Sequence, residues 1–522
     1  MSQPLTVWHV TREYAGLAEA GGVKDVVRGL AEAHARAGAM VSVVLPLYGF
    51  LPRDLAAAKP VTSFALSLPD QDKGNAFQEE TVRVLAAQRE GVRLLLVDSP
   101  RFSQKRDVYV YTAEDEKENR WRTRGSGHWD FHQLNLTLQR AALETALALD
   151  ELPDVFHCHD GHTGFLPALM REDARYAAPF RRTGAVLTIH NAGAGYHQEV
   201  WDPGFAGLLT GLPEPVLSKG ELDGATDPLL LAGSYARLVT VSERYAEEML
   251  GEREKEMSGG LGRTLRERGI PLRGITNGID PSPWDPRFPQ RTGLPAAFNP
   301  ETGDLAGKRK CREVLAERLA LKGHRGFSDE PVYAFVGRLT GQKGVHQLYE
   351  AIRKLVGASA ACRFVVLGQG EKTMEAMLAN LAAQTSASGR LTFVARYDNP
   401  LASLIYAGSD FFLIPSAYEP CGLTDYVAQL VGSIPVVHHV GGLVKVRDGE
   451  TGFSYDEHST GALVSAIERT AGLYRRDPQA LERIRRRAFR EIFSHHTWDR
   501  VLSDGYLPLY EKETAHSAWT GK

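Results

Sequence analysis

The sequence predicts an α/β protein of two domains, each built on a parallel sheet. The chain has 522 residues, and a single hydrophobic core stops growing at roughly 250–300 residues. Short apolar runs rich in β-branched residues alternate with segments of helical periodicity along the chain, which is typical of parallel strands covered by helices. A stretch rich in proline and glycine, residues 275–303, interrupts this alternation and indicates a linker between the domains.

Eleven apolar runs predict the strands. Six belong to the first domain: residues 5–10, 40–47, 92–98, 154–160, 185–191 and 237–242. Five belong to the second domain: residues 331–339, 362–370, 391–397, 410–417 and 434–440. Apolar residues at helical spacing predict helices between them; three such stripes are Val23, Val26, Val27 and Leu30, then Val427, Leu430 and Val431, then Leu481, Ile484 and Ala488. We expect domains over residues 1–278 and 279–495, and a helical segment over 496–522.

Composition and charge exclude several classes of function. The net charge of −3 argues against nucleic acid or an acidic membrane as the main partner. The four cysteines form no spaced cluster, which fits a reducing compartment better than a disulfide framework. The chain starts without a signal-peptide pattern, and no apolar run nears the ~20 residues that span a bilayer. We therefore expect a cytoplasmic protein with no membrane partner.

Two cations follow the first strand of the second domain. Arg338 and Lys343 lie five residues apart, beside Gly341 and Gly344, just after an apolar run. Ligands of open parallel sheets bind at the carboxyl ends of the strands. A diphosphate suits this pair, because a guanidinium binds oxygens as a fork and an ammonium acts as a point charge. Ordinary surface charge is the alternative.

A second candidate site follows the strand at 410–417. Glu419 is followed by Cys421, Gly422, Leu423 and Thr424, at the start of a predicted helix. Consecutive N–H groups at a helix start attract phosphate. Glu419 beside them could bind a sugar hydroxyl or offset positive charge on a sugar ring. An ordinary glutamate in a turn is the alternative.

The first domain offers weaker signals. Gly21 and Gly22 open a helix after the first strand, where backbone N–H groups could approach an anion, although a plain tight turn predicts the same glycines. His190 ends a buried strand and could hydrogen-bond a substrate, although a structural role in a loop is as good an interpretation.

Four polar residues crowd the end of the strand at 154–160: His157, His159, Asp160 and His162. Imidazole and carboxylate groups are ordinary zinc ligands. No cysteine pair or HExxH spacing accompanies them, so we expect no metal. The alternative is that one histidine is satisfied in the core and that Asp160 caps the next helix.

These motifs together resemble the bacterial glycogen synthases and plant starch synthases. "EPCGLT" at 419–424 and "RLTGQKG" at 338–344 are the most specific, and "TNGID" at 276–280, "VVLPLYG" at 43–49 and "FHCHDGHT" at 156–163 also fit. The resemblance runs from about residue 5 to 510. It implies a GT-B fold, with two facing Rossmann-like domains and a C-terminal helix that crosses back to the N-terminal domain.

The resemblance also implies an activity. The family's enzymes are retaining, metal-independent glucosyltransferases of glycogen biosynthesis. They transfer glucose from ADP-glucose to the non-reducing end of an α-1,4-glucan such as glycogen or maltooligosaccharide, without a cofactor. For this chain it implies a nucleotide sugar and a glucan as partners, and no nucleic acid.

The family's catalytic roles map onto five residues. Arg338 and Lys343 match the pair that holds the donor diphosphate and stabilises the leaving group. Glu419 matches the acid that supports the transferred glucose, His190 the histidine that contacts it, and Asp160 an acid at the cleft. The implied substrate-binding residues are the N-terminal glycine loop, a hinge residue, an aromatic near the base and the donor-binding loop: Gly21, Gly22, Asp25, Asn277, Tyr397, Cys421, Gly422, Leu423 and Thr424.

The sequence departs from the family pattern at several positions. Glu19 stands where the family has a lysine, Asp425 where it has a glutamine, and Leu230 or Leu231 where another lysine is expected. Residues 192–196 also differ from the usual sequence after the histidine. Two unit charges ~4 Å apart interact by a few kcal/mol at intermediate dielectric, so Glu19 is not neutral beside a donor.

Two alternatives follow from these departures. One is a retaining glucosyltransferase that uses UDP-glucose or a small acceptor. The other is a non-catalytic glucan-binding relative. Intact Arg338, Lys343 and Glu419 argue against the second, since a protein without catalysis has no need for them.

Overall fold

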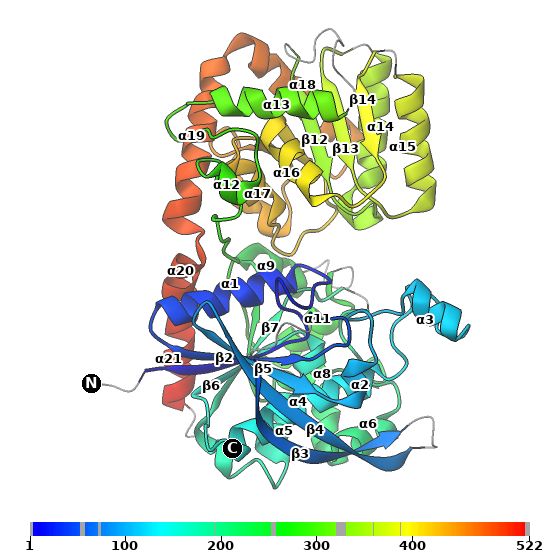
Figure 1. The fold of residues 1–522 in the computed structure, drawn as a ribbon, viewed down its shortest axis with the longest axis vertical. Coiled ribbons are helices and arrows are strands. Elements are labelled where there is room, and N and C mark those ends of the chain that lie inside the picture. Colours follow the sequence, from blue (N-terminus) through cyan, green and yellow to red (C-terminus); the bar gives the residue numbers. More distant parts are fainter. Residues whose placement is uncertain are drawn as a thin grey trace. The chain divides into compact units, whose positions relative to one another are not determined.

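The computed structural model describes residues 4–52, 58–70, 75–193, 195–251, 257–319, 330–358, 360–386 and 388–516. The chain divides into two compact units (Figure 1). The N-terminal unit comprises Met1–Gly278 and Trp498–Lys522, and the C-terminal unit comprises Ile279–Thr497. No helix among the described residues combines the length and the apolar character needed to cross a membrane.

The N-terminal unit is built on a nine-stranded sheet in the order β11-β10-β7-β6-β1-β2-β5-β4-β3. Its parallel strands are β1 (Thr6–Val10), β2 (Met40–Pro46), β5 (Val92–Asp98), β6 (Val155–His159), β7 (Gly184–Ile189), β10 (Arg237–Thr240) and β11 (Leu272–Gly274). All six predicted strands of this half are confirmed. The register of β1 against β6 and of β6 against β7 brings their carboxyl ends to one edge of the sheet.

Three strands of this sheet were not predicted from the sequence: β3, β4 and β11. β3 (Lys59–Asp70) and β4 (Ala76–Arg89) form an antiparallel hairpin at one edge, and β4 also pairs antiparallel with β5. Buried and more exposed residues mix along both strands, as in a sheet with one face in solvent. They therefore contain no continuous apolar run of the kind that revealed the parallel strands, and β11 has only three residues.

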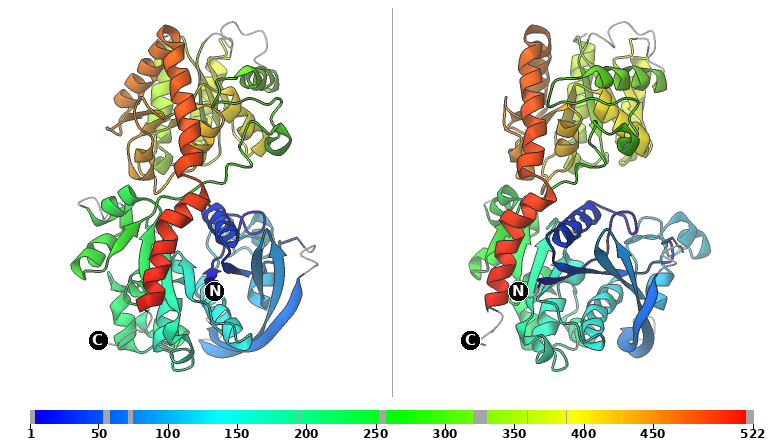
Figure 2. Two further views of the ribbon diagram at one scale, coloured as in Figure 1. Left: turned by 90° about the vertical axis from the view of Figure 1, so that its left-hand side faces the viewer. Right: turned by 60° about the vertical axis from the view of Figure 1, so that its left-hand side comes forward.

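The last helices return to the N-terminal unit, as the resemblance implies (Figure 2). α20 (Trp498–Val501), a wider turn over Leu502–Tyr506 and α21 (Leu507–His516) follow one another. Their apolar residues share a core with β1 and with α1 (Val23–Arg36). A Cβ atom on Gly29 of α1 would lie 2.1 Å from Nε1 of Trp498, so this close approach requires glycine.

The C-terminal unit has a six-stranded parallel sheet in the order β14-β13-β12-β15-β16-β17. Its strands are β12 (Val332–Val336), β13 (Arg363–Leu367), β14 (Leu391–Val394), β15 (Phe411–Ile414), β16 (Ile434–His438) and β17 (Phe453–Tyr455). The five predicted strands are confirmed, and only the three-residue β17 was missed.

Helices cover both faces of this second sheet with separate apolar cores. One core includes residues of α14 (Val345–Gly357), α15 (Lys372–Gln384) and α18 (Thr460–Arg476). The other includes residues of α13 (Ala306–Arg318), α16 (Asn399–Gly408) and α17 (Thr424–Leu430). α19 (Pro478–His495) contributes to both cores, and its predicted stripe of Leu481, Ile484 and Ala488 is buried.

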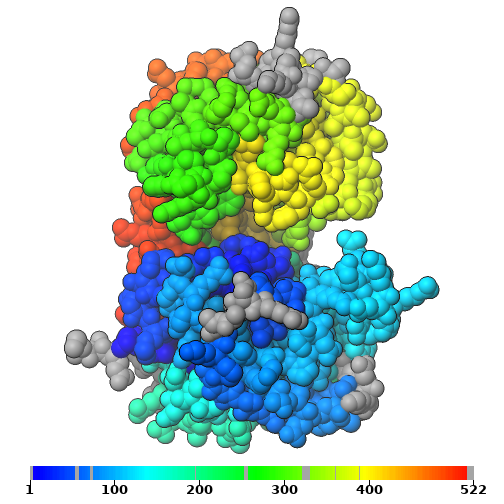
Figure 3. Space-filling view, viewed as in Figure 1, coloured from blue at the N-terminus to red at the C-terminus, as the bar shows by residue number. Residues whose placement is uncertain are grey.

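Nine further helices are described in the N-terminal unit. They are α2 (Pro100–Ser103), α3 (Ala113–Glu118), α4 (Phe131–Ala148), α5 (Leu166–Glu172), α6 (Pro203–Thr210), α7 (Glu214–Leu217), α8 (Pro228–Ala232), α9 (Glu243–Leu250) and α11 (Leu261–Glu267). The segment that carries α3 stands out from the surface of this unit (Figure 3). In the C-terminal unit α12 (Pro289–Thr292) precedes α13.

Candidate active site

The two predicted cations lie in the loop that follows β12. Lys343 closes a 3₁₀ turn over Gly341–Lys343, and Gly344 follows in the left-handed region, at φ +66°. A Cβ atom on Gly344 would lie 1.8 Å from the carbonyl oxygen of Pro415. The turn is therefore pressed against the end of β15, and this contact requires glycine.

The structure brings Lys343 and Glu419 into direct contact. The Lys343 ammonium donates to Oε2 of Glu419 at 2.6 Å. The hydroxyl of Ser416 donates to the same oxygen at 3.0 Å. Glu419 is only 7% exposed, so its carboxylate is desolvated and neutralised by the ammonium. One carboxylate is thus fixed beside one cation, at the end of β15.

Arg338 differs from Lys343 in its surroundings. It is exposed, and within the described ranges no hydrogen bond or ion pair engages its guanidinium. Its five N–H donors face solvent and are available to an anion. An exposed guanidinium without an ion-pair partner among the described residues, in the same loop as Lys343, is suited to a ligand that carries several oxygens.

The donor-binding loop predicted at 421–424 forms a tight turn before α17. Gly422 has φ +76°, Leu423 is the capping position and Thr424 is the first residue of the helix. Gly432 has φ +66°, directly after the C-cap residue Val431, where a helix commonly ends on a glycine in the left-handed region. Tyr397, the predicted aromatic, is 81% exposed in the loop after β14, two strands away from β12.

In the N-terminal unit the structure joins Asp160 to His190. The backbone N–H of His190 donates to Oδ1 of Asp160 at 2.7 Å. Asp160 makes no side-chain cap for the following turn, so the helix-cap interpretation was wrong. Burial raises the pKa of Asp160 to about 7 and lowers the pKa of His190 to about 3. His190 is therefore a neutral imidazole at the carboxyl end of β7, and Asp160 orients its backbone.

His190 begins a chain of hydrogen-bonded histidines. Its Nε2 lies 3.0 Å from Nδ1 of His159, whose Nε2 lies 3.0 Å from Nδ1 of His9. His157 stacks on His159 and bonds to Thr188 and Tyr510 through its two nitrogens. Burial lowers the pKa of His9, His157 and His159 well below the usual value. These histidines form a neutral, buried hydrogen-bond network that ends at His190, one of the predicted site residues.

Of the four residues of the metal interpretation, His157 and His159 cluster with His9, whereas Asp160 and His162 are not in this cluster. In the described part of the chain, His9, His157 and His159 bring one nitrogen each within 4.8 Å of one another. Five of their six ring nitrogens already have hydrogen-bond partners. Asp160 instead binds the His190 backbone, and His162 stacks on Tyr109.

The glycine loop holds a carboxylate of the protein itself. Oε2 of Glu13 accepts from the N–H of Gly21 at 2.6 Å and from the N–H of Ala20 at 3.1 Å. Its Oε1 accepts from the hydroxyl of Tyr109 at 2.8 Å. The anion predicted at this loop is therefore supplied by Glu13. A Cβ atom on Gly22 would meet nothing within 4 Å, so packing does not explain that glycine.

The charged residues around this loop pair with one another. Lys24 lies 3.0 Å from Asp25 and 4.0 Å from Glu19. Glu19 also accepts from the N–H of Gly16 at 2.6 Å. The ammonium of Lys24, which could take the place of the family lysine, is thus shared between two exposed carboxylates.

Asn277, the predicted hinge residue, and the two leucines that stand where the family has a lysine are all buried. Asn277 is 3% exposed, and its N–H donates to the carbonyl of Val241 at 3.2 Å. It precedes Gly278, after which the C-terminal unit begins at Ile279. Leu230 and Leu231 are fully buried in α8, so they belong to the core. Of the departing residues 192–196, Ala194 lies outside the described residues.

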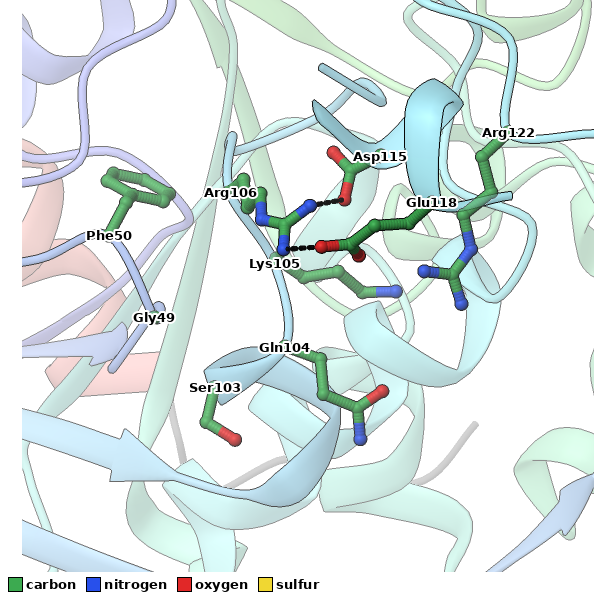
Figure 4. A pocket seen from close by; sticks show the side chains of 9 residues that line it. All are labelled: Gly49, Phe50, Ser103, Gln104, Lys105, Arg106, Asp115, Glu118 and Arg122. Atoms are coloured by element: carbon green, nitrogen blue, oxygen red, sulfur yellow. Dashed lines mark hydrogen bonds and ion pairs between the residues drawn. The ribbon is translucent and has the colours of Figure 1, made fainter. Parts of the chain in front are cut away.

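One pocket of about 360 Å³ lies elsewhere in the N-terminal unit (Figure 4). Its charged lining residues largely neutralise each other: Arg106 pairs with Asp115 at 3.4 Å and with Glu118 at 2.5 Å. None of the predicted site residues lines it, and we assign it no part in the activity.

Sequence reasoning missed two charged residues that shape the site. Glu13 lies three positions beyond β1 and binds the glycine loop. An acid just after a strand was the available signal. Lys445 hydrogen-bonds the donor-binding loop, at the carbonyls of Cys421 and Gly422. A single lysine after "GGL" forms no pattern, so only the structure reveals it.

Comparison with known proteins agrees over the whole chain. The family model of the starch synthase catalytic domain matches residues 6–267, and that of glycosyl transferases group 1 matches residues 319–488. The glycogen synthase of Aeromonas hydrophila is 31% identical over 98% of this chain and 99% of its own. That of Lacticaseibacillus casei is 29% identical over 97% of this chain and 100% of its own.

Solved structures give the same result. The catalytic domain of starch synthase IV from Arabidopsis thaliana, solved with ADP and acarbose, aligns with a TM-score of 0.79 at 26% identity, over 98% of this chain and 100% of that one. The sucrose-phosphate synthase of Thermosynechococcus elongatus, at 16% identity and a TM-score of 0.57, supports the fold alone. The GT-B fold is confirmed, and the chain belongs to the glycogen and starch synthase family of glycosyltransferases.

Proposed function

We propose that this protein transfers glucose from ADP-glucose to the non-reducing end of an α-1,4-glucan, with retention of the anomeric configuration and without a metal. Family membership supports the glucan and the sugar nucleotide. The starch synthase IV structure, named for its complex with ADP and acarbose, supports ADP as the nucleotide. The observation that carries the proposal is the Lys343–Glu419 pair beside the unpaired Arg338.

The chemistry begins with the bond between the anomeric carbon and the phosphate oxygen. When that bond breaks, its electron pair goes to the diphosphate and positive charge spreads over the sugar ring. Arg338 and Lys343 bind the negative leaving group. Fixed charges aimed at developing charge often supply the largest part of catalysis. The acceptor hydroxyl then bonds to the anomeric carbon, and its proton passes to the departing phosphate.

Glu419 acts at the other pole of the reaction. Its carboxylate is buried and held by Lys343 and Ser416. In this role it opposes the positive charge of the ring or binds a sugar hydroxyl. Lys343 contacts Glu419, so in the proposed complex its ammonium is shared between this carboxylate and the donor phosphate. The pair thus places one cation between the two developing charges.

Within the N-terminal unit, His190 is a neutral hydrogen-bonding group. Burial keeps the His190 imidazole uncharged, which suits contact with a sugar hydroxyl better than with phosphate. Asp160 fixes the backbone N–H of His190, and His159 fixes its ring. Both contacts orient His190 without adding a charge near the sugar.

Donor-panel kinetics test the proposal. Purified protein is incubated with glycogen and either ADP-glucose or UDP-glucose, and nucleotide release is measured. We expect release that depends on glycogen and is faster with ADP-glucose, and a product that an α-1,4-specific glucosidase digests. Preference for UDP-glucose would contradict the donor assignment. Glycogen binding without any nucleotide release would instead identify a non-catalytic relative.

A further inference from the structure

We propose that Lys445 is a positioning residue of the donor site, which joins the turn over residues 419–424 to the turn over 441–445 and so fixes Glu419 and Thr424. This inference rests on the proposed function. It concerns a residue that touches neither Arg338 nor Lys343 in the structure.

The Lys445 ammonium lies where three backbone carbonyls converge. Its Nζ donates to the carbonyl oxygens of Cys421 at 2.5 Å, Gly422 at 2.8 Å and Gly442 at 3.0 Å. An ammonium has three N–H donors, so these carbonyls use all of them. The Lys445 side chain is 9% exposed, and without it these carbonyls would lose their cation in a largely dry environment.

A buried acid completes the arrangement. Oδ1 of Asp425 lies 3.2 Å from the Lys445 Nζ, and the Asp425 side chain is fully buried. Nζ also lies 4.4 Å from the centre of the Tyr426 ring. A buried carboxylate without a compensating charge is strongly destabilising. Through Asp425, Lys445 therefore links the first turn of α17 to the turn over residues 419–424.

The two turns are in direct contact, which makes this link effective. The N–H of Gly442 donates to the carbonyl of Glu419 at 2.9 Å. A Cβ atom on Gly442 would lie 2.1 Å from the carbonyl oxygen of Cys421, so no other residue permits this approach. The backbone of Glu419 thus rests on the turn that Lys445 fastens. A shift of that turn moves the carboxylate that pairs with Lys343.

Asp425 also lies in the electrostatic field of the site. Burial raises the pKa of Asp425 to about 6; the Lys445 ammonium opposes this rise, and the negative charge of Glu419 adds to it. Burial, and to a smaller extent Asp425, raises the pKa of the Tyr406 hydroxyl; burial, and to a smaller extent Lys445, lowers the pKa of His496. Lys445 therefore favours the ionised form of Asp425 while two carboxylates lie near one another.

The test measures ADP affinity and turnover in Lys445→Gln and Lys445→Arg. Glutamine removes the charge and at least one of the three hydrogen bonds, whereas arginine keeps the charge. We expect Lys445→Gln to weaken ADP binding and to raise the donor KM by at least about tenfold, the equivalent of one lost buried contact. Lys445→Arg should recover part of that loss. The KM for glycogen should stay within roughly twofold, because the change concerns donor binding alone.

Lys308→Gln is the matched control. Lys308 is a buried lysine of the same unit that bonds to two carbonyls, those of Ala407 at 2.8 Å and Val431 at 3.2 Å. Its substitution should lower the Tm without a selective change in donor KM. If Lys445→Gln and Lys308→Gln changed Tm and donor KM in the same proportion, or if Lys445→Gln bound ADP normally, the proposal would be overturned.

A second variant pair covers the case in which Lys445→Gln does not fold. Asp425→Asn removes the buried charge that faces Lys445 and keeps the volume. The double variant with Lys445→Gln should fold, because the uncompensated carboxylate is gone, and should bind ADP more weakly than Asp425→Asn alone, because the three carbonyls have lost the ammonium. Equal ADP affinity in Asp425→Asn and the double variant would contradict the proposal. Calorimetric ADP binding needs no turnover, so it separates failure of this inference from failure of the proposed activity.

Discussion

The ammonium of Lys343 lies 2.6 Å from the carboxylate of Glu419. A sugar-nucleotide donor therefore meets a cation that is already bound to an acid of the protein. The pair is neutral as a whole, so the carboxylate of Glu419, a residue that is 7% exposed, is not an uncompensated buried charge. Arg338, which is solvated and unpaired in the described ranges, supplies the net positive charge. Removal of Lys343 would therefore leave a buried carboxylate without its partner, whereas removal of Arg338 would not.

Substitution of the two cations should separate catalysis from stability. Arg338→Ala should lower kcat/KM by about 10²–10³, the usual cost of one transition-state contact, without changing the Tm. Lys343→Ala should lower it at least as far and also reduce the Tm, because Glu419 loses its partner. Steady-state kinetics and thermal melting check both effects.

The control for this pair is Lys310→Ala, an exposed lysine that pairs with Glu313 at 3.1 Å. Lys310→Ala should change neither kcat/KM nor the Tm, since exposed ion pairs contribute ~0–1 kcal/mol to stability. Near-normal rates in both Arg338→Ala and Lys343→Ala would contradict the proposal that these cations stabilise the departing diphosphate.

Glu19→Lys should lower the donor KM. In the structure Glu19 is an exposed carboxylate that shares Lys24 with Asp25 near the glycine loop. The substitution replaces a negative charge by a positive one, which favours a bound anion. Kinetics at varied ADP-glucose check this, with Glu214→Lys, at an exposed residue of α7, as the control in the same unit. An unchanged Michaelis constant would show that Glu19 does not face the donor.

The parallel strands could be predicted from the sequence because each is a continuous apolar run. The hairpin of β3 and β4 could not, since its buried residues mix with exposed ones. The same division applies to the candidate site. Arg338, Lys343 and Glu419 belong to short sequence motifs whose residue types indicate binding of a diphosphate or a sugar. Glu13 and Lys445 act on segments that lie far away in the sequence or across a turn, so their roles follow only from the folded backbone.

Activity should survive treatment with EDTA. The charges that a divalent ion would bring to a diphosphate come from Arg338 and Lys343 in the proposed mechanism. Nucleotide release is measured before and after chelation, and again after addition of Zn²⁺ or Mg²⁺. Loss of activity that Zn²⁺ restores would point to the cluster of His9, His157 and His159, whose nitrogens lie within 4.8 Å of one another.

Alkaline pH should loosen the segment that follows His190. Nδ1 of His197 lies 2.5 Å from Oδ2 of Asp227, and its Nε2 lies 2.7 Å from the carbonyl of Ala192. Burial alone lowers the pKa of His197, but the hydrogen bond and charge of Asp227 outweigh it and raise the pKa to about 9. The folded pKa thus exceeds the unfolded value of about 6.5. The added stability is complete below pH 6.5 and is lost as the pH rises through 9.

The comparison of wild type with His197→Gln isolates this contribution. A pKa difference of two to three units corresponds to about 3 kcal/mol. The stability difference between the two proteins should therefore be largest near pH 6 and shrink by that order near pH 10. Urea unfolding at a series of pH values measures it. A difference that stays constant with pH would mean that His197 is neutral when folded, and the ion pair with Asp227 would then be excluded as the cause.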